Sequence, residues 1–160
     1  MLRISNLTEL EYRALNQSIT LRKPDDWHVH LRDGAMLAMA LPWTSAAFGR
    51  AIVMPNLTPT VTTSAQASAY RERICQLLPE NSSFEPLMTC FLTDATDPDD
   101  VAQGFADGIL TAAKMYPANS TTNSATGVTD VSKIYPVLER MQQIGMPLLI
   151  HGEVTDREVD

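Results

Sequence analysis

Residues 25–34 read DDWHVHLRDG, and this stretch places two of the chain's three histidines on either side of one valine. In a β-strand, side chains two positions apart point to the same face, so His28 and His30 project together if the segment is extended. Arg32 continues their row. Neutral imidazole is a common metal ligand, which makes the pair a candidate for part of a metal site. Such a short motif also occurs in exposed histidine pairs that bind nothing, so both interpretations stay open at this point.

Beyond this stretch, extended segments alternate with helical ones. The expected strands are 18–32, 50–56, 84–94, 110–119 and 146–154. The expected helices lie in the segments 35–48, 64–80, 97–108 and 130–145, and the first of them is expected to end before Pro42. Such alternation implies a parallel sheet whose strands are joined by helical crossovers.

Residues at the ends of the expected helices support these boundaries. A cluster of serines and threonines precedes the helix at 64–80 and can cap it. Asp97 and Pro98 fit the cap and the first helical position of the next helix. Gly108 and Gly145 are placed where glycine commonly ends a helix.

The spacing of these units is compatible with two α/β folds. They recur about every 30 residues, close to the spacing in a (β/α)8 TIM-type barrel, which holds eight units in ~250 residues. A doubly wound sheet gives the same alternation. The first strand is not followed by a GxGxxG pattern, which weakens the dinucleotide-binding form of that fold. The alternation alone leaves both folds open.

Composition and charge exclude several classes of function. The 160 residues are 44% hydrophobic and 19% charged, which suits one domain with a buried core. A net charge of −7 argues against nucleic acid and against a basic membrane-surface helix. No apolar run has the length of a membrane span, and the N-terminus lacks a signal-peptide core. Cys75 and Cys90 form no CxxC pair and indicate free thiols, so we expect a cytoplasmic protein.

Two segments interrupt the rhythm of strands and helices. Residues 1–17 are an expected N-terminal extension, in which Thr8 and Glu11 fit a capping box, ahead of a domain at 18–160. Residues 117–130 are small, polar and almost free of charge. This second segment is either a solvated loop or a mobile lid over a site, and the sequence favours neither.

The candidate functional residues lie at or near the ends of the expected strands. Active sites of such barrels form at the carboxyl ends of the strands. All three histidines, His28, His30 and His151, fall at such ends. Asn56 follows the second strand, and Lys114 lies near the end of the fourth. Each residue alone has an ordinary structural explanation, so the prediction of a metal site rests on their shared position at the carboxyl edge of the expected sheet. This edge, with His28, His30, Asn56, Lys114 and His151, is called the rim below.

Lys114 requires a chemical explanation if it belongs to that site. A protonated lysine has only donors and repels a cation. Reaction with carbon dioxide would give an anionic carbamate, whose two oxygens can bridge two metal ions. Two divalent ions about 3.5–4 Å apart can bind and activate a water between them. Imidazole and carboxylate-type ligands suit zinc.

Several motifs, in order and with compatible spacing, resemble one family. They are DDWHVHLRDG, AIVMPNLTPTVTT, LMTCFLTD, AAKMYPANSTTNSATGVT and GMPLLIHGEV. Together they are similar to dihydroorotases of the short bacterial type, which belong to the metal-dependent amidohydrolases. The resemblance runs from about Ser18 to the last residue, while residues 1–17 have no clear counterpart. It implies a (β/α)8 barrel, of which this chain holds about the first five strands.

The resemblance also implies a role for each rim residue. His28 and His30 match the ligands of the more buried of two zinc ions, and His151 matches a ligand of the second. Lys114 matches the carboxylated lysine that bridges them. The residues that match the substrate site are Arg32 and Asn56, which bind the substrate carboxylate, and Thr121 and Thr122, which belong to a closing loop. A planar guanidinium suits a carboxylate because it can pair with it in a bidentate manner.

The family pattern also needs a histidine on the sixth strand and an aspartate on the eighth. The chain ends at Asp160, just after the expected fifth strand, so both residues are expected to lie beyond Asp160. That aspartate is the family's general acid and base. We therefore expect no catalytic residue in this chain and regard the sequence as truncated.

The implied reaction interconverts N-carbamoyl-L-aspartate and dihydroorotate in pyrimidine synthesis, and its substrate is small and anionic. A homodimer is a further expectation. The alternatives are another cyclic amidohydrolase, such as a hydantoinase or allantoinase, and a catalytically inactive metal- or partner-binding fragment.

Overall fold

Five parallel strands form one sheet in the order β1–β2–β3–β4–β5 in the structure, a computed structural model that describes residues 20–153. The strands are β1 Asp25–Val29, β2 Arg50–Val53, β3 Glu85–Phe91, β4 Ala112–Met115 and β5 Leu148–Ile150. Each strand pairs in parallel with the next one along the chain. This sequential order is that of a half-barrel, as the resemblance to dihydroorotases implied, and not that of a doubly wound sheet, which the alternation alone had left open.

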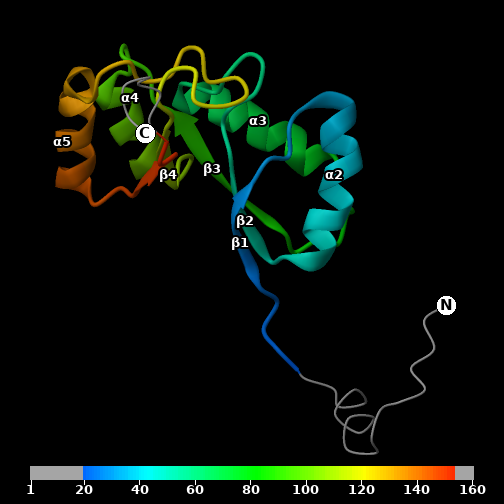
Figure 1. The fold of residues 1–160 in the computed structure, drawn as a ribbon. Coiled ribbons are helices and arrows are strands. Elements are labelled where there is room, and N and C mark those ends of the chain that lie inside the picture. Colours follow the sequence, from blue (N-terminus) through cyan, green and yellow to red (C-terminus); the bar gives the residue numbers. More distant parts are fainter. Residues whose placement is uncertain (1–19, 154–160) are drawn as a thin grey trace, which may run out of the picture.

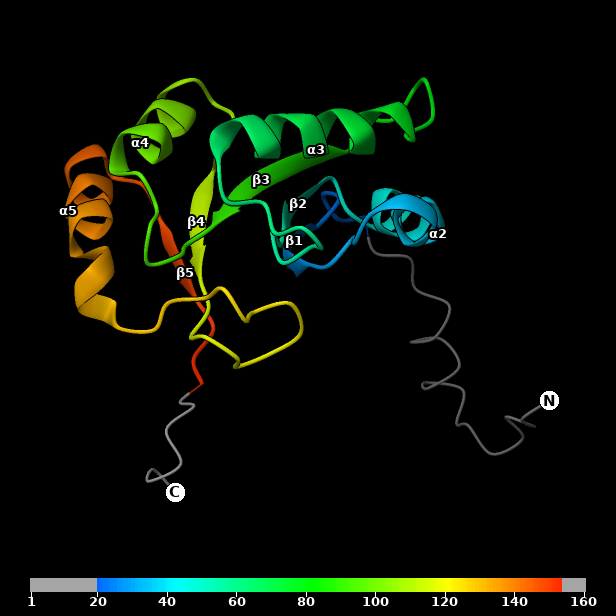
Figure 2. The ribbon, with the colours of Figure 1, turned by 90° about the horizontal axis from the view of Figure 1, so that it is seen from above.

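The helices lie along one side of the sheet in chain order, as Figure 2 shows from above. They are α2 Gly34–Ala47, α3 Ser64–Gln76, α4 Pro98–Ala106, a 3-10 turn Val131–Ile134 and α5 Tyr135–Ile144. Figure 1 shows the connection that follows β4, residues 116–130, as a long yellow loop beside the end of the sheet.

Local sequence explains where these helices begin and end. Thr63 accepts a hydrogen bond from the Gln66 amide, while the Gln66 side chain reaches back to the Thr63 amide, so a capping box opens α3. The Asp97 side chain caps α4, and Pro98 occupies its first turn. Gly145 ends α5 with a φ of 70°, a conformation that glycine adopts without steric cost. The caps predicted from the sequence are confirmed at all three positions.

The prediction that the first helix ends before Pro42 is wrong, because α2 continues to Ala47. Proline removes one backbone donor, yet Leu37, Leu41 and Ser45 recur every four residues and are all buried. Burial of this stripe therefore outweighs one lost helical hydrogen bond.

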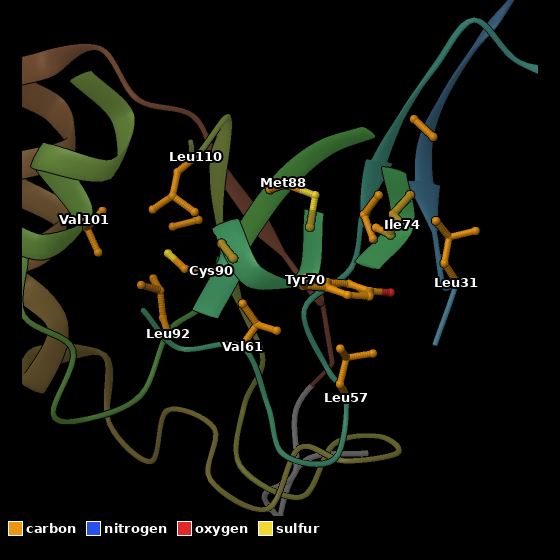
Figure 3. Close-up of a cluster of buried hydrophobic side chains, with 14 of the residues drawn as sticks. Leu31, Leu57, Val61, Tyr70, Ile74, Met88, Cys90, Leu92, Val101 and Leu110 are labelled. Carbon is orange, nitrogen blue, oxygen red and sulfur yellow. The ribbon is translucent and has the colours of Figure 1, made fainter. Parts of the chain in front are cut away.

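The core lies between the sheet and its helices. Figure 3 shows Tyr70 and Ile74 of α3 facing apolar side chains of the strands and their connections. The labelled members of this cluster are Leu31, Leu57, Val61, Tyr70, Ile74, Met88, Cys90, Leu92, Val101 and Leu110. No helix within residues 20–153 is both long enough and apolar enough to cross a membrane.

Two predictions fall at the ends of the chain. The expected extension at 1–17 lies outside the described residues, and so does Asp160, at which the expected domain ends. Both boundaries therefore stay predictions.

Candidate active site

The candidate residues gather at the carboxyl ends of four strands. His28 lies within β1 and His30 directly after it, Lys114 lies within β4, and His151 directly follows β5. Asn56 lies a few residues beyond the end of β2. The structure thus brings the predicted rim residues to one end of the sheet, because parallel strands present their carboxyl ends at the same edge.

The first strand is less regular than the alternation argument assumed. Asp26 pairs with Ala51 and Val29 with Val53, so the register between β1 and β2 shifts within this short stretch. The His28 amide donates to Asp26 Oδ1 at 2.9 Å inside this irregular segment. Bulges commonly re-aim side chains next to functional sites. Sequence alternation could not have revealed this irregularity.

His28 and His30 nevertheless converge. Their Nε2 atoms lie 3.2 Å apart, with ring centroids separated by 5.1 Å. His30 Nδ1 lies 2.9 Å from Asn56 Oδ1, and since an amide oxygen only accepts, Nδ1 carries the proton. A neutral His30 therefore presents the lone pair of Nε2 toward His28, which is the arrangement that a shared cation requires.

The electrostatics of the rim favour neutral imidazoles. Partial burial is the main cause that lowers the pKa of His28, and the positive charge of Lys114 lowers it further. The pKa of His30 is lowered by burial and then by Arg32. Neutral imidazole is the form that binds metal, so the site favours the binding-competent state.

Lys114 is the least expected buried group of the rim. Only 2% of its surface is exposed, and burial lowers the pKa of its amine. Among residues 20–153, Nζ forms no ion pair with any carboxylate and lies 4.9 Å from the centroid of the Tyr116 ring. A buried lysine without an anionic partner is costly, which favours its neutral form. A neutral amine is also the form that reacts with carbon dioxide.

His151 has a partner that the sequence interpretation missed. Its Nε2 lies 2.7 Å from Glu153 Oε2, and its ring lies 5.5 Å from the ring of Tyr116. Tyr116 stacks on Phe91, and burial raises its pKa to about 12. The signal for Glu153 was present in the sequence, because it follows His151 at the same two-residue interval that separates His28 from His30.

The side chains of the rim fit zinc as ligands if Lys114 is carboxylated. Within residues 20–153, no three His, Cys, Asp or Glu side chains lie together as a ready metal-binding group. Two converging imidazoles supply neutral nitrogen ligands, and a carbamate on Lys114 would add the anionic oxygens that zinc accepts. The Tyr116 ring lies beside Lys114 and His151, and its buried hydroxyl has no hydrogen-bond partner within residues 20–153, so this part of the rim holds an unused polar group.

The long loop is docked on the rim through Asn56. This buried asparagine donates from Nδ2 to the Thr122 carbonyl at 3.0 Å. The backbone carbonyl of Asn56 accepts from Asn123 Nδ2 at 3.0 Å and from Arg32 Nη1 at 3.3 Å. The side chains of Thr121 and Thr122 are exposed. The structure thus brings Arg32 and Thr122 into contact with Asn56, and it adds Asn123, which the sequence interpretation did not single out. Thr121 lies next to Thr122 on the same loop and makes no hydrogen bond to Asn56, and the roles of all four predicted residues stay predictions.

The far end of this loop is fixed as well. Asp94 accepts from the Thr129 amide at 2.9 Å and from Lys133 Nζ at 2.8 Å. These bonds lower the pKa of Asp94 to about 2, and the bond from Lys133 has the largest effect. Ser124 closes the tip by donating to the Thr121 carbonyl at 2.6 Å. The loop therefore has a defined docked conformation.

The resemblance implies two further site residues, a histidine on the sixth strand and the catalytic aspartate on the eighth. The sequence interpretation placed both beyond Asp160, which itself lies outside the described residues 20–153. The positions of both residues therefore stay predictions.

Comparison with known proteins identifies relatives that match about nine-tenths of the chain. No protein-family model matches it. Dihydroorotases of Ruegeria pomeroyi and Erwinia tasmaniensis are 62% and 63% identical to it, over 91% and 90% of this chain. The matched part is 42% and 41% of those proteins, so the chain spans about two-fifths of the length of the curated relatives it matches.

Solved structures give the same result. The dihydroorotase of Campylobacter jejuni matches 84% of this chain with a TM-score of 0.76 and 37% identity, over 39% of its own length. The dihydroorotase of Saccharomyces cerevisiae, solved in complex with 5-fluoroorotic acid, matches 86% of it with a TM-score of 0.75 and 34% identity, over 38% of its own length. An L-hydantoinase of Arthrobacter aurescens shares the fold at 15% identity. By sequence and by fold, this chain is therefore homologous to the dihydroorotases and corresponds to the N-terminal portion of their barrel.

Proposed function

We propose that this chain is part of a dihydroorotase, an enzyme that interconverts N-carbamoyl-L-aspartate and dihydroorotate in pyrimidine biosynthesis. The observation that carries the proposal is the convergence of His28 and His30, with Nε2 atoms 3.2 Å apart, on a rim that also holds buried Lys114. Homologues named dihydroorotase at about 62% identity support it. Below, the full-length protein means the longer polypeptide that we expect to contain this chain.

We infer that the full-length protein binds two zinc ions. His28 and His30 would hold one, His151 would help to hold the other, and a carboxylated Lys114 would contact both. When bound, the ions supply Lewis acidity, which polarises an amide carbonyl and lowers the pKa of water. The protein's own contribution is to keep the imidazoles neutral through burial, while the His30–Asn56 contact fixes the proton of neutral His30 on Nδ1 and leaves Nε2 free for a metal.

Substrate recognition falls to Arg32 and Asn56, with Thr121 and Thr122 on the covering loop. The Arg32 guanidinium lies 3.3 Å from the Asn56 carbonyl, which leaves its remaining donors for a substrate carboxylate. Asn56 Nδ2 now donates to the loop, and a substrate carboxylate would compete for the same donor. Recognition of an anion by these two residues favours dihydroorotate over the uncharged rings of hydantoin-type substrates.

We make three further proposals about the full-length protein. The full-length enzyme is a homodimer, as we expected from its resemblance to dihydroorotases. It works in the cytoplasm, which agrees with Cys75 and Cys90 being free thiols. The proton is moved by an aspartate that follows Asp160 in the full-length protein, since no residue here matches the one that the family uses. A catalytically inactive binding module remains the competing function.

One assay separates these alternatives. The full-length protein, purified with zinc and bicarbonate, is offered dihydroorotate, hydantoin and allantoin, before and after removal of metal by a chelator. We expect ring opening of dihydroorotate alone, its loss with the metal and its return with zinc. Preferred turnover of hydantoin or allantoin would contradict the assignment of substrate. Absence of turnover on all three rings, in protein that retains zinc, would favour the binding module.

A further inference from the structure

The backbone of Arg32 is held in a conformation that needs outside support. Its φ of 61° lies in the left-handed region, which residues other than glycine adopt uncommonly. Such a conformation persists where the surrounding structure fixes it, and it is frequent at functional sites. The residues that hold this turn therefore influence where the guanidinium lies.

Tyr70 supplies one of these constraints from α3. Its hydroxyl donates to the Arg32 carbonyl at 2.5 Å, and the side chain is almost completely buried. In Figure 3 the Tyr70 ring extends across the core, with its hydroxyl oxygen toward the side where Leu31 lies. Burial raises the pKa of this hydroxyl, so it remains a donor at any physiological pH.

Arg73, one turn further along α3, supplies a second constraint. Its Nε and Nη2 atoms lie 3.1 and 2.8 Å from Asp33 Oδ2, in a forked pair with the residue that follows Arg32. Asp33 in turn accepts from the Gly34 amide and caps α2. The Arg73 guanidinium also lies 5.3 Å from the centre of the Tyr70 ring, so the two constraints form one unit.

We propose that Tyr70 is a positioning residue for substrate binding, which holds Arg32 in its left-handed turn with the help of the Arg73–Asp33 pair. The turn directs Arg32 Nη1 to the Asn56 carbonyl at 3.3 Å, and so places the guanidinium beside the amide expected to share the substrate carboxylate. This inference rests on the proposed function, because it assigns the support for that same carboxylate site.

The test is Tyr70→Phe in the full-length, zinc-loaded protein, which removes one oxygen and keeps the ring. We expect KM for dihydroorotate to rise roughly 5- to 15-fold, with kcat within about twofold and zinc content unchanged, because one buried hydrogen bond is lost. Ser64→Ala is the matched control, since its hydroxyl donates from the first turn of α3 to Asp100 Oδ1 at 2.6 Å. It should lower the melting temperature without changing KM.

A second variant covers the case in which Tyr70→Phe does not fold. Arg73 is 43% exposed, so Arg73→Gln should fold, and it should raise KM roughly 2- to 5-fold through the loss of its pair with Asp33. KM unchanged in both variants would overturn the proposal. The proposal would also be overturned if Tyr70→Phe and Ser64→Ala lowered kcat and raised KM by the same factors, because such equal effects would indicate general destabilisation.

A direct readout separates this inference from the proposed function. The Nε–H signal of Arg32 in an NMR spectrum, assigned by its loss in Arg32→Met, reports on the guanidinium whether or not the protein turns over dihydroorotate. We expect it to shift in Tyr70→Phe and to stay in place in Ser64→Ala. An unmoved signal in Tyr70→Phe would overturn the positioning role, whereas a moved signal in a protein without activity would contradict only the proposed function.

Discussion

Arg32 is the residue on which selection of an anionic substrate depends. Replacing it with methionine keeps much of the length of the side chain and removes the charge. We predict that KM for dihydroorotate rises about 30- to 150-fold, because a charge-assisted pair in a dry site contributes ~2–3 kcal/mol. Zinc content should not change, since Arg32 is not among the proposed ligands. Steady-state kinetics with metal analysis checks both statements, with exposed Arg71→Met as control. Unaltered kinetics in Arg32→Met would remove this residue from the carboxylate site.

The histidine pair makes a second prediction, about pH. The folded-state pKa values of His28 and His30 are lowered from 6.5, so below that value the unfolded chain binds more protons than the folded one. Stability of the metal-free protein should therefore be greatest above pH 6.5 and fall as the pH drops below it. Melting temperatures of the metal-free full-length protein, from about pH 8 to about pH 5, measure the slope. The double variant His28→Gln, His30→Gln should have a flatter profile, and an equal slope in both proteins would contradict this explanation.

At the scale of elements, the loop after β4 depends on close backbone contact at Gly127. A Cβ at this position would lie 2.5 Å from the Tyr116 carbonyl oxygen and 3.0 Å from that of Ser124. Gly127→Ala must therefore displace the loop that carries Thr121 and Thr122, since backbone atoms cannot move aside cheaply. We predict faster hydrogen exchange across residues 117–130 and a KM for dihydroorotate raised several-fold, on the order of 3- to 10-fold.

Gly49→Ala is the control for that experiment, because the nearest atoms to an added Cβ there are at ordinary contact distances of 3.7 Å or more. It should leave exchange in the loop unchanged. If exchange in Gly127→Ala matches that of Gly49→Ala, the loop is not held by this contact.

The helices and strands also show which features of the fold could be predicted from the sequence. The capping signals at Thr63, Asp97 and Gly145 were readable because they act on neighbouring residues. Pro42 misled because burial of one face of α2 outweighs a local breaking signal. The irregularity in β1 arises from pairing with β2, and that pairing is not encoded in the alternation of β1 alone.

The candidate site was predictable to a similar degree. The rim positions followed from the rule that parallel strands end at a common edge. The contacts of Asn56 with His30 and with Thr122 join segments that are far apart in the chain, so only the fold reveals them. The support of Arg32 by Tyr70 is of the same kind, across 38 positions.

At the scale of the whole molecule, the described sheet has two open edges, β1 and β5. Unpaired edge strands and exposed apolar side chains promote association. Trp27 on β1 and Ile150 on β5 are 58% and 57% exposed, and Met36, Met39 and Trp43 are exposed along α2. Parallel strands are normally covered on both faces. The two strand edges are therefore the surfaces that a complete barrel would pair.

We predict that residues 1–160 expressed alone aggregate or need a partner at these edges, and that they have no measurable dihydroorotase activity. Absence of a general acid and base alone removes about 10²–10⁴-fold in rate. The check is ring opening of dihydroorotate with added zinc and bicarbonate, alongside sedimentation of the same sample. Turnover within about tenfold of the full-length protein would show that no proton-transfer group beyond Asp160 is needed, against our expectation.

The central claim is that His28, His30 and a carboxylated Lys114 hold zinc on one rim. The most direct measurement is diffraction from crystals of the full-length protein, grown with zinc and bicarbonate, at wavelengths on both sides of the zinc absorption edge. We expect an anomalous peak contacted by Nε2 of His28 and Nε2 of His30, with electron density continuing beyond Lys114 Nζ toward that peak. An absent peak at the histidine pair, or an unmodified lysine pointing away from the metal, would contradict it.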